Sequence, residues 1–303
     1  MPEDLALAEL LDLVPALRGE RTVAELAGGL TNTNYKVTND AGAFVVRVSA
    51  KDSGMLAIDR ENEYRNSVAA AEAGVGARVI DYVPEHSLLI LEFIEGTTQN
   101  AEDLRRGDKI EMVARACRRL HEGPRFRDDF NMFDIQRRYL KLVQERGFRL
   151  PERYLEFEPQ VRRIEAAMAV RDEGAVPCNN DLLAENFIDV GDEFRLIDYE
   201  YSGQNDACFE LGNVWSESNL SLDQLELLVT HYYGRTLRNR IARARLWGLM
   251  SKYGWTLWAS IQDGVSAIDF DFWGWGMEKY DRAVAEFDGP DFDHLLDEVV
   301  RAD

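Results

Sequence analysis

The stretch Asn180-Asp181-Leu182-Leu183-Ala184-Glu185-Asn186, followed twelve residues later by Asp198, is the most informative part of the sequence. Two short and largely apolar runs lie between Asn186 and Asp198, at 186–190 and 194–197, and the dipeptide Gly191-Asp192 separates them. Apolar runs on either side of a glycine-containing turn predict a β-hairpin. Asp181, Asn186 and Asp198 are therefore expected at one edge of a single loop–hairpin unit.

Two carboxylates and an amide in this order have the chemistry that phosphoryl transfer requires. One carboxylate accepts the proton of the attacking hydroxyl, while an amide oxygen and a second carboxylate hold Mg²⁺ against the phosphates. A D-x-x-x-x-N pattern also occurs among the polar turn residues of ordinary hairpins, but the strand ending in Leu196-Ile197-Asp198 makes the kinase interpretation more specific. We interpret the unit as a catalytic loop followed by a metal-binding segment.

The chain before this unit predicts a small antiparallel sheet with one helix. Leucines at helical spacing indicate a first helix over 3–17. A second helix is expected to end at Gly74, because glycine readily adopts the left-handed conformation of a helix cap. The strands are expected at 22–27, 35–38, 43–49, 78–83 and 87–93, and the second helix at 57–73.

Helical periodicity dominates the chain after Glu95-Gly96. Helices are expected at 102–121, 134–146, 152–171, 221–233, 239–262 and 274–286, and the unit at 177–200 is the one expected break. A β-rich first third joined to a helical remainder predicts an α+β fold of two lobes. The smaller lobe would span 1–95 and bind a nucleotide, and the larger would span 96–303 and hold the catalytic loop and the acceptor site. Ligands commonly bind in the cleft between such lobes.

The composition narrows the range of partners. The chain of 303 residues has a formal net charge of −20 at pH 7, which repels nucleic acids and anionic lipids and suits a cationic substrate. No apolar run reaches the roughly 20 residues that span a bilayer, and the acidic start Met1-Pro2-Glu3-Asp4 is unlike the basic start of a signal peptide. The three cysteines are widely spaced and predict reduced thiols. These features predict a cytoplasmic protein.

Several motifs resemble those of the choline/ethanolamine kinases, a family among the aminoglycoside-phosphotransferase-like and protein-kinase-like folds. The resemblance runs through most of the chain. Its best match is the run Leu196-Ile197-Asp198-Tyr199-Glu200-Tyr201-Ser202, continuing to Phe209-Glu210-Leu211-Gly212-Asn213. The phosphate loop matches at Gly28-Gly29-Leu30-Thr31-Asn32-Thr33-Asn34, and the third strand at Phe44-Val45-Val46-Arg47-Val48. A helix segment matches at Arg60-Glu61-Asn62-Glu63-Tyr64. The hinge matches at Glu92-Phe93-Ile94-Glu95-Gly96, and a helix end at Leu120-His121.

The resemblance implies a phosphotransferase that uses ATP and Mg²⁺. Asp181 would be the catalytic base, and Asn186 and Asp198 would bind Mg²⁺. Arg47 would contact the nucleotide phosphates while paired with Glu63, since a guanidinium on a strand needs a carboxylate to orient it. The phosphate loop and the hinge would supply the other nucleotide contacts, at Gly29, Thr31, Asn32, Asn34, Glu92, Phe93 and Ile94.

One residue departs from the family pattern. The family usually has His-Asn-Asp or His-Gly-Asp in the catalytic loop, whereas this chain has Asn179-Asn180-Asp181. The family histidine ties the catalytic loop to the metal-binding segment by a hydrogen bond. Because an asparagine amide both donates and accepts hydrogen bonds, Asn179 is expected to replace that histidine.

The last third of the sequence is rich in aromatic residues. Proteins bind quaternary ammonium groups with aromatic faces and a nearby carboxylate. Trp255 and Trp258 are three residues apart and share one face of the expected helix. The resemblance implies that Trp255, Trp258, Phe272 and Trp275 form a cage and that Glu217 supplies the charge. The alternative is that these aromatic residues pack a helical core.

The sequence therefore predicts a kinase that transfers the γ-phosphate of ATP to choline or a related small amino alcohol, with no oligomeric state specified. A kinase of another small alcohol (ethanolamine, thiamine, an aminoglycoside or a sugar) is the first alternative. The second alternative is a pseudokinase that binds its ligand without transferring phosphate, and the reason to consider it is Asn179 in place of the family histidine. A metal hydrolase using Asp181, Asp198 and Asp206 is set aside, because no histidine clusters with these carboxylates in the sequence.

Overall fold

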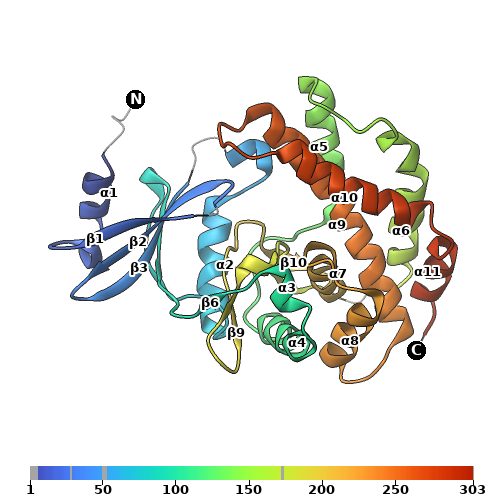
Figure 1. The fold of residues 1–303 in the computed structure, drawn as a ribbon, viewed down its shortest axis with the longest axis horizontal. Coiled ribbons are helices and arrows are strands. Elements are labelled where there is room, and N and C mark those ends of the chain that lie inside the picture. The colour runs from blue at the N-terminus through green and yellow to red at the C-terminus, as the bar shows by residue number, and fades with distance from the viewer. Residues whose placement is uncertain (1–5, 28, 50–52, 172–173, 303) are drawn as a thin grey trace.

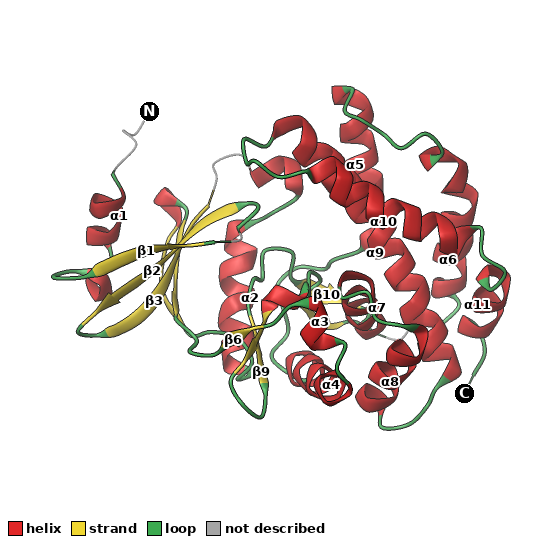
Figure 2. Cartoon of the chain, in the orientation of Figure 1, coloured by secondary structure: helices red, strands yellow, loops and turns green. Residues whose placement is uncertain are grey.

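The computed structural model describes residues 6–27, 29–49, 53–171 and 174–302. A five-stranded antiparallel sheet lies at one end of the molecule and a larger, mainly helical part makes up the rest (Figures 1 and 2). This arrangement confirms the predicted α+β fold of two lobes. The boundary expected near residue 95 stays a prediction.

The N-terminal sheet has the strand order β1-β2-β3-β5-β4. Its strands are β1 Thr22–Leu26, β2 Asn32–Asn39, β3 Gly42–Ser49, β4 Val79–Val83 and β5 Leu88–Glu92. Side chains alternate between the two faces of a strand, so Phe44 and Val46 of β3 lie in the apolar cluster that includes Leu11 and Leu17. Arg47 points to the opposite face, toward helix α2 Arg60–Glu72. Asp59 caps the start of α2 by accepting hydrogen bonds from the first turn.

The first helix is shorter than expected. Helix α1 covers Leu7–Leu13, and a separate 3₁₀ turn covers Pro15–Leu17. Val14 between them is extended, because a residue that precedes proline is disfavoured in the helical conformation. Residues 3–5 of the expected helix lie outside the described residues.

The C-terminal part contains helices on both sides of the expected hairpin. The helices are α3 Ala101–Leu104, α4 Gly107–His121, α5 Met132–Arg146, α6 Glu158–Ala169, α7 Ala207–Glu217, α8 Leu222–Tyr233, α9 Arg238–Val265, α10 Phe272–Phe287 and α11 Phe292–Val299. The strands are β6 Thr97–Thr98, β7 Val176–Cys178, β8 Phe187–Asp189, β9 Phe194–Leu196 and β10 Gly203–Asn205. Strands β8 and β9 form the predicted hairpin.

Three details of the helical prediction are wrong. The helix expected over 152–171 begins only at Glu158, after a 3₁₀ turn at Tyr154–Phe157. The helix expected over 102–121 is interrupted, since Arg106 is extended and α4 begins at Gly107. Helices α7 and α11 are also missing from the prediction. Residues 208–216 of α7 are all buried, including the polar Glu210, Asn213 and Ser216, so polarity does not mark a solvent-exposed face in this stretch.

Helices α7 and α9 pack unusually closely, and this contact positions much of the site. A Cβ atom on Gly212 of α7 would lie 2.1 Å from the carbonyl oxygen of Ala244 on α9, and one on Gly248 would lie 2.6 Å from the carbonyl oxygen of Gly212. Only glycine permits such an approach. Helix α9 runs beneath α10 through this part of the molecule (Figure 1). Among the described residues, no helix combines the length and apolarity needed to cross a membrane.

Candidate active site

A cavity of about 410 Å³ lies between the β1–β2 loop and the helical part of the chain. The β1–β2 side contributes Gly29, Leu30, Thr31, Asn32 and Asn34. The other side contributes Asp181, Leu183, Glu185, Asn186, Asp198, Glu200, Tyr201, Glu217, Trp255, Trp258, Phe270 and Trp275. The structure thus brings together the three residues predicted for catalysis, four of those predicted for nucleotide binding and four of those predicted for the acceptor.

The catalytic loop follows β7 and is held in an unusual backbone conformation. Asn180 and Asp198 have positive φ angles, of 68° and 63°. Asparagine and aspartate tolerate this region better than most residues, and such strain tends to occur at functional sites. The Asn180 side chain stabilises its own turn by donating to the carbonyl of Tyr201 at 3.0 Å and accepting from Asn205 at 2.8 Å.

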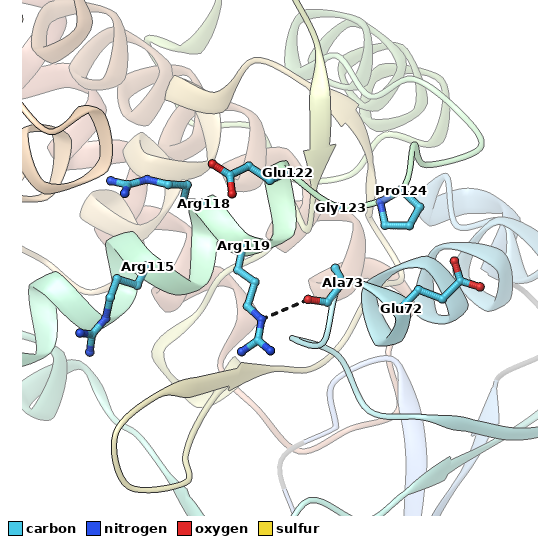
Figure 3. Close-up of a pocket in the computed structure, with 8 residues that line it drawn as sticks. All are labelled: Glu72, Ala73, Arg115, Arg118, Arg119, Glu122, Gly123 and Pro124. Atoms are coloured by element: carbon cyan, nitrogen blue, oxygen red, sulfur yellow. Dashed lines mark hydrogen bonds between the residues drawn. The ribbon is translucent and has the colours of Figure 1, made fainter.

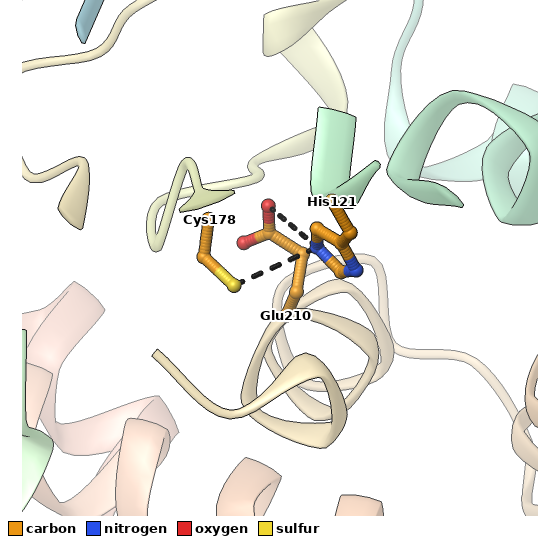
Figure 4. Close-up of side chains that lie close together, drawn as sticks. All are labelled: His121, Cys178 and Glu210. Carbon is orange, nitrogen blue, oxygen red and sulfur yellow. Dashed lines mark hydrogen bonds and ion pairs between the residues drawn. The ribbon is translucent and has the colours of Figure 1, made fainter. Parts of the chain in front are cut away.

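A buried carboxylate, Glu210, supports this loop, and Figure 4 shows it beside His121 and Cys178. Glu210 of α7 accepts hydrogen bonds from the backbone N–H groups of Asn179 and Asn180, at 2.8 and 2.9 Å. His121, at the end of α4, lies 3.7 Å from Glu210 and 3.6 Å from Cys178. These three side chains are close enough to hold a metal ion. Because each Glu210 oxygen already accepts a backbone hydrogen bond, we interpret the cluster as structural support for the loop.

Asn179 connects the catalytic loop to the metal-binding segment, as expected. Its side-chain nitrogen donates to the carbonyl oxygens of Ile197 and Asp198, at 3.1 and 2.8 Å. Its side-chain oxygen accepts from the N–H of Asp181 at 3.1 Å. The amide therefore joins the loop that carries Asp181 to the segment that carries Asp198, which is the role predicted for it in place of histidine.

Replacing Asn179 with alanine is expected to lower kcat by about tenfold or more and the free energy of unfolding by about 1–3 kcal/mol, because buried hydrogen-bonding groups lose their partners. Urea unfolding and steady-state kinetics on the same samples check both effects. Asn39→Ala, which removes a side-chain hydrogen bond to the Ala16 carbonyl far from the site, is the control. An Asn179→Ala enzyme with unchanged kcat would contradict the bridging role.

Asp181 is partly buried in the cavity wall beside other carboxylates. Burial and the negative charges of Glu217 and Asp198 raise the pKa of Asp181 well above its usual range. A raised pKa makes a carboxylate a better proton acceptor. The side-chain nitrogen of Asn186 donates to the backbone carbonyl of Asp181 at 2.6 Å, which leaves the Asn186 side-chain oxygen as the atom available to a metal ion.

Arg47 forms the predicted ion pair with Glu63, at 2.6 Å, and this pairing is confirmed. The same guanidinium nitrogen also lies 2.7 Å from Asp198. Burial alone would lower the pKa of Arg47, but the charges of Asp198 and Glu63 outweigh it and raise that pKa above its ordinary value. Arg47 lines a narrow space of about 20 Å³ next to the main cavity, and Asp198 lines both.

Glu200 is a central residue that the sequence interpretation missed. It accepts hydrogen bonds from Thr31 at 2.8 Å and from Asn32 at 2.9 Å, and so joins the β1–β2 loop to the segment after Asp198. Burial and the charge of Asp198 raise the pKa of Glu200 to about 7. The available signal was its position within the matched run Leu196-Ile197-Asp198-Tyr199-Glu200-Tyr201-Ser202, two residues after Asp198.

The β1–β2 loop turns sharply at Gly29. A Cβ atom there would lie 2.2 Å from the carbonyl oxygen of Asn32, so the turn requires glycine. Gly28, the first residue of the predicted phosphate loop, lies outside the described residues.

The three hinge residues at the end of β5 do not line this cavity. The N–H of Phe93 donates to the carbonyl of Ala43 at 3.0 Å, and the Phe93 ring lies 3.5 Å from the Lys36 ammonium. Nucleotide contacts by Glu92, Phe93 and Ile94 stay a prediction.

The far wall of the cavity is aromatic. Trp255, Trp258 and Trp275 line it together with Tyr201 and Phe270. The ring nitrogen of Trp258 donates to the Tyr201 hydroxyl at 2.8 Å, which fixes both rings. These contacts give the wall a rigid aromatic surface.

Phe272 needs a correction, because it is not part of this wall. Its ring packs against Trp258, with ring centroids 5.8 Å apart, and is buried. The exposed Phe270 occupies the cavity rim instead. Residue 272 starts α10, and the helix turns its side chain into the core.

Glu217, the last residue of α7, brings a buried carboxylate to the aromatic wall. One of its oxygens pairs with the Lys279 ammonium. The other, Oε1, is buried and has no hydrogen-bond partner in the described part of the chain. An unpaired buried carboxylate oxygen is costly, so this atom fits a site that receives a cation.

Comparisons with known proteins agree with this geometry. The sequence profile of the family described as choline/ethanolamine kinase matches residues 23–232. Protein LicA of Haemophilus influenzae is 26% identical, over 78% of this chain and 72% of that protein. Ethanolamine kinase 2 of the mouse is 25% identical, over 91% of this chain and 79% of that protein. A solved choline/ethanolamine kinase family protein from Mesorhizobium loti has a TM-score of 0.84 and 29% identity, covering 96% of this chain and 97% of that one.

The family profile covers well over half of the chain and includes Asp181, Asn186 and Asp198, the two carboxylates and the amide that phosphoryl transfer requires. The chain belongs to the choline/ethanolamine kinase family and is a kinase that phosphorylates the hydroxyl group of a small amino alcohol.

Proposed function

We propose that this kinase uses Mg-ATP to phosphorylate choline or a closely related methylated amino alcohol. The observation that carries the proposal is the placement of a tryptophan wall and the unpartnered Glu217 oxygen in the same cavity as Asp181. A cation held at the wall would keep its hydroxyl group within the cavity that also contains the proposed base. The proposal extends the family assignment to a substrate.

Asp181 is proposed to accept the proton of the acceptor hydroxyl. The hydroxyl oxygen then forms a bond to the γ-phosphorus, and the bond from that phosphorus to the bridging oxygen of ADP breaks. Burial and the neighbouring carboxylates favour this role, since both raise the pKa of Asp181. The proton ends on the Asp181 carboxylate.

Asn186 and Asp198 are proposed to hold Mg²⁺. Their free amide and carboxylate oxygens are the hard donors that this ion prefers, and Mg²⁺ in kinases binds through one or two carboxylates together with substrate phosphates. The residues therefore fit the ion. When bound, Mg²⁺ neutralises charge on the phosphates. Arg47, which already lies 2.7 Å from Asp198, would add its guanidinium charge beside them, and Gly29, Thr31, Asn32 and Asn34 would surround the phosphates.

The wall favours choline, because ring faces attract a quaternary ammonium group that has no hydrogen-bond donor. A primary ammonium needs acceptors for its N–H groups. The free Oε1 atom of Glu217 is one such acceptor, and this observation makes ethanolamine the second candidate. The presence of Asn179 in place of the family histidine motivated the pseudokinase alternative. A role limited to ligand binding is less consistent with the site, since Asn179 makes the bridging hydrogen bonds expected of that histidine.

The proposal is tested by measuring ADP release with Mg-ATP across a panel of acceptors. The panel contains choline, ethanolamine and its mono- and dimethyl forms, thiamine, an aminoglycoside and a hexose. We expect kcat/KM to rise with each added methyl group. A preference for an aminoglycoside or a sugar, or ADP release that no acceptor stimulates, would contradict it.

The charge of Glu217 is expected to select the cation. We predict that Glu217→Gln lowers the preference for choline over its neutral isostere 3,3-dimethylbutan-1-ol by about tenfold, or ~1.4 kcal/mol. The ratio of the two kcat/KM values is the measurement. Because both alcohols are assayed on the same variant, any destabilisation from the unpaired Lys279 cancels. An unchanged ratio would place the cation away from Glu217.

A further inference from the structure

A second cavity, of about 490 Å³, shares no lining residue with the candidate active site. It lies among the turn after α3, the end of α7, the middle of α9 and the end of α10, as the lining residues show. They include Arg105, Trp215, Ser216, Lys252, Arg282 and Glu286.

Lys252 is the unusual member of this lining. Its residue exposure is 5%, and its ammonium lies 3.5 Å from the centre of the Trp215 ring. No oxygen of the described residues accepts a hydrogen bond or forms an ion pair with it. The two other buried lysines differ, since Lys109 pairs with Asp189 at 2.5 Å and Lys279 pairs with Glu217. Lys252 therefore lacks the hydrogen-bonding anion that the other two buried lysines have. Burying an ammonium group without such a partner is costly.

The rest of the cavity is also suited to an anion. Arg105 and Arg282 add two positive charges to its lining, in a protein whose net charge is −20. Glu286 is the acidic residue of the lining, and its carboxylate is paired with Arg245 at 2.9 Å. The Ser216 hydroxyl is buried and has no hydrogen-bond partner among the described residues. A hydroxyl and three cationic groups around one space favour a dianion over a monoanion.

We propose that this cavity is a binding site for a phosphate group, either inorganic phosphate or the phosphate of a small monoester, with Lys252 as its central cation. Arg282 and Arg105 contribute charge at the rim, and Ser216 contributes a hydrogen bond. The site is independent of the acceptor proposed for the kinase reaction. Lys252 stands one helical turn before Trp255 on α9, and Ser216 adjoins Glu217 on α7, so an occupant would contact the same two helices that build the acceptor wall.

The protonation of the Lys252 ammonium is consistent with a bound anion. Burial lowers the pKa of Lys252 to about 7. The charged groups near it are Glu286 and Glu217, which raise that pKa, and Arg282 and Lys279, which lower it. A bound dianion would raise it again and restore the full charge of the ammonium.

A larger hollow near the junction of α2 and α4 also contains arginines, but it is a weaker candidate (Figure 3). Arg118 donates to the carbonyl oxygens of His231 and Tyr232. Arg119 donates to the carbonyl of Ala73 at 3.1 Å and pairs with Glu193 at 2.6 Å. Arg105 and Arg282 of the proposed site also have partners, the Ser218 carbonyl and Glu278. The difference between the two cavities lies in Lys252, which has no hydrogen-bonding partner among the described residues.

Isothermal titration of the intact protein with inorganic phosphate, and separately with glycerol 2-phosphate, tests the proposal. EDTA is present and nucleotide is absent, so that the acidic active site repels the anion. We expect one site per chain in the wild type, and an affinity at least about tenfold weaker in Lys252→Met. Lys141→Met removes the same charge from an exposed lysine on α5, and its affinity should stay within about twofold of the wild type.

Each outcome of these titrations either supports or contradicts the phosphate site. Binding of either probe that Lys252→Met weakens and Lys141→Met does not supports the site, and the tighter probe identifies the source of the phosphate group. Absence of binding at millimolar phosphate, or equal affinities in the two variants, overturns the proposal. If Lys252→Met does not fold, Arg282→Gln replaces it. The exposed partner of Arg282, Glu278, is solvated, and unchanged affinity in Arg282→Gln would then be the contradicting result.

Discussion

Asp181→Asn is expected to lower kcat by about 10²- to 10⁴-fold, the usual contribution of a general base. The amide has nearly the shape of the carboxylate but does not accept the proton of the acceptor hydroxyl. Affinity for Mg-ATP should change little, because the proposed metal ligands are Asn186 and Asp198. Acceptor-dependent ADP release and calorimetric titration with Mg-ATP measure the two quantities.

Glu185→Gln is the matched control for this variant. Glu185 lines the same cavity and is exposed, and its substitution removes the same charge. We expect its kcat to stay within about threefold of the wild type. If Asp181→Asn and Glu185→Gln lost activity equally, the negative potential of the cavity and not a base at Asp181 would explain the effect.

The second large effect is expected for Asp198→Asn. This substitution removes the carboxylate proposed to bind Mg²⁺ and also the 2.7 Å partner of Arg47. Metal stabilisation of transition-state charge contributes several kcal/mol, so kcat should fall by about 10³-fold. The concentration of Mg²⁺ that gives half-maximal activity should rise as well, and Mg-ATP should bind more weakly.

These readouts distinguish Asp198 from Asp181, since Asp181→Asn should leave the Mg²⁺ dependence unchanged. Titrations with free ATP in EDTA provide the reference, because loss of the metal ligand should not weaken metal-free nucleotide binding. If Asp198→Asn kept the wild-type Mg²⁺ dependence, the ion would have to bind elsewhere.

The sequence predicted the sheet and most of the helical part because their patterns are local. The aromatic and β-branched residues of 44–48 mark β3 as a strand, and the apolar runs around Gly191-Asp192 mark the hairpin. Helix α7 was missed because residues 208–216 are all buried, polar residues included, and so have no solvent-exposed face that polarity would mark. The break before α4 depends on two residues, Arg106 and Gly107, and is too short to alter the periodicity of the surrounding sequence.

The site was predictable where its residues form short motifs. Asp181, Asn186 and Asp198 are close in the sequence, and the structure brings them to one cavity. Glu200 and Glu210 were not predicted, because their partners are distant side chains and backbone groups: Glu200 bonds to Thr31, 169 residues away. A motif does not show such contacts, and only the fold establishes them.

The sequence also does not show which aromatic side chains face the cavity, as Phe272 illustrates. Phe270 and Phe272 are both aromatic and both lie near the start of α10, so composition does not separate them. The backbone direction at residue 272 sends that ring behind Trp258, while Phe270 stays at the cavity rim. Asn179 shows the opposite case, since the chemistry of an amide was sufficient to predict its bridging role.

The central claim is tested most directly by incubating the wild-type protein with Mg-ATP and choline and measuring both products, ADP and phosphocholine. We expect them in equal amounts, with ADP formation depending on choline, abolished by EDTA and largely lost in Asp181→Asn. Mg-ATP binding without choline-dependent ADP release, or ADP formed without phosphocholine, would contradict it.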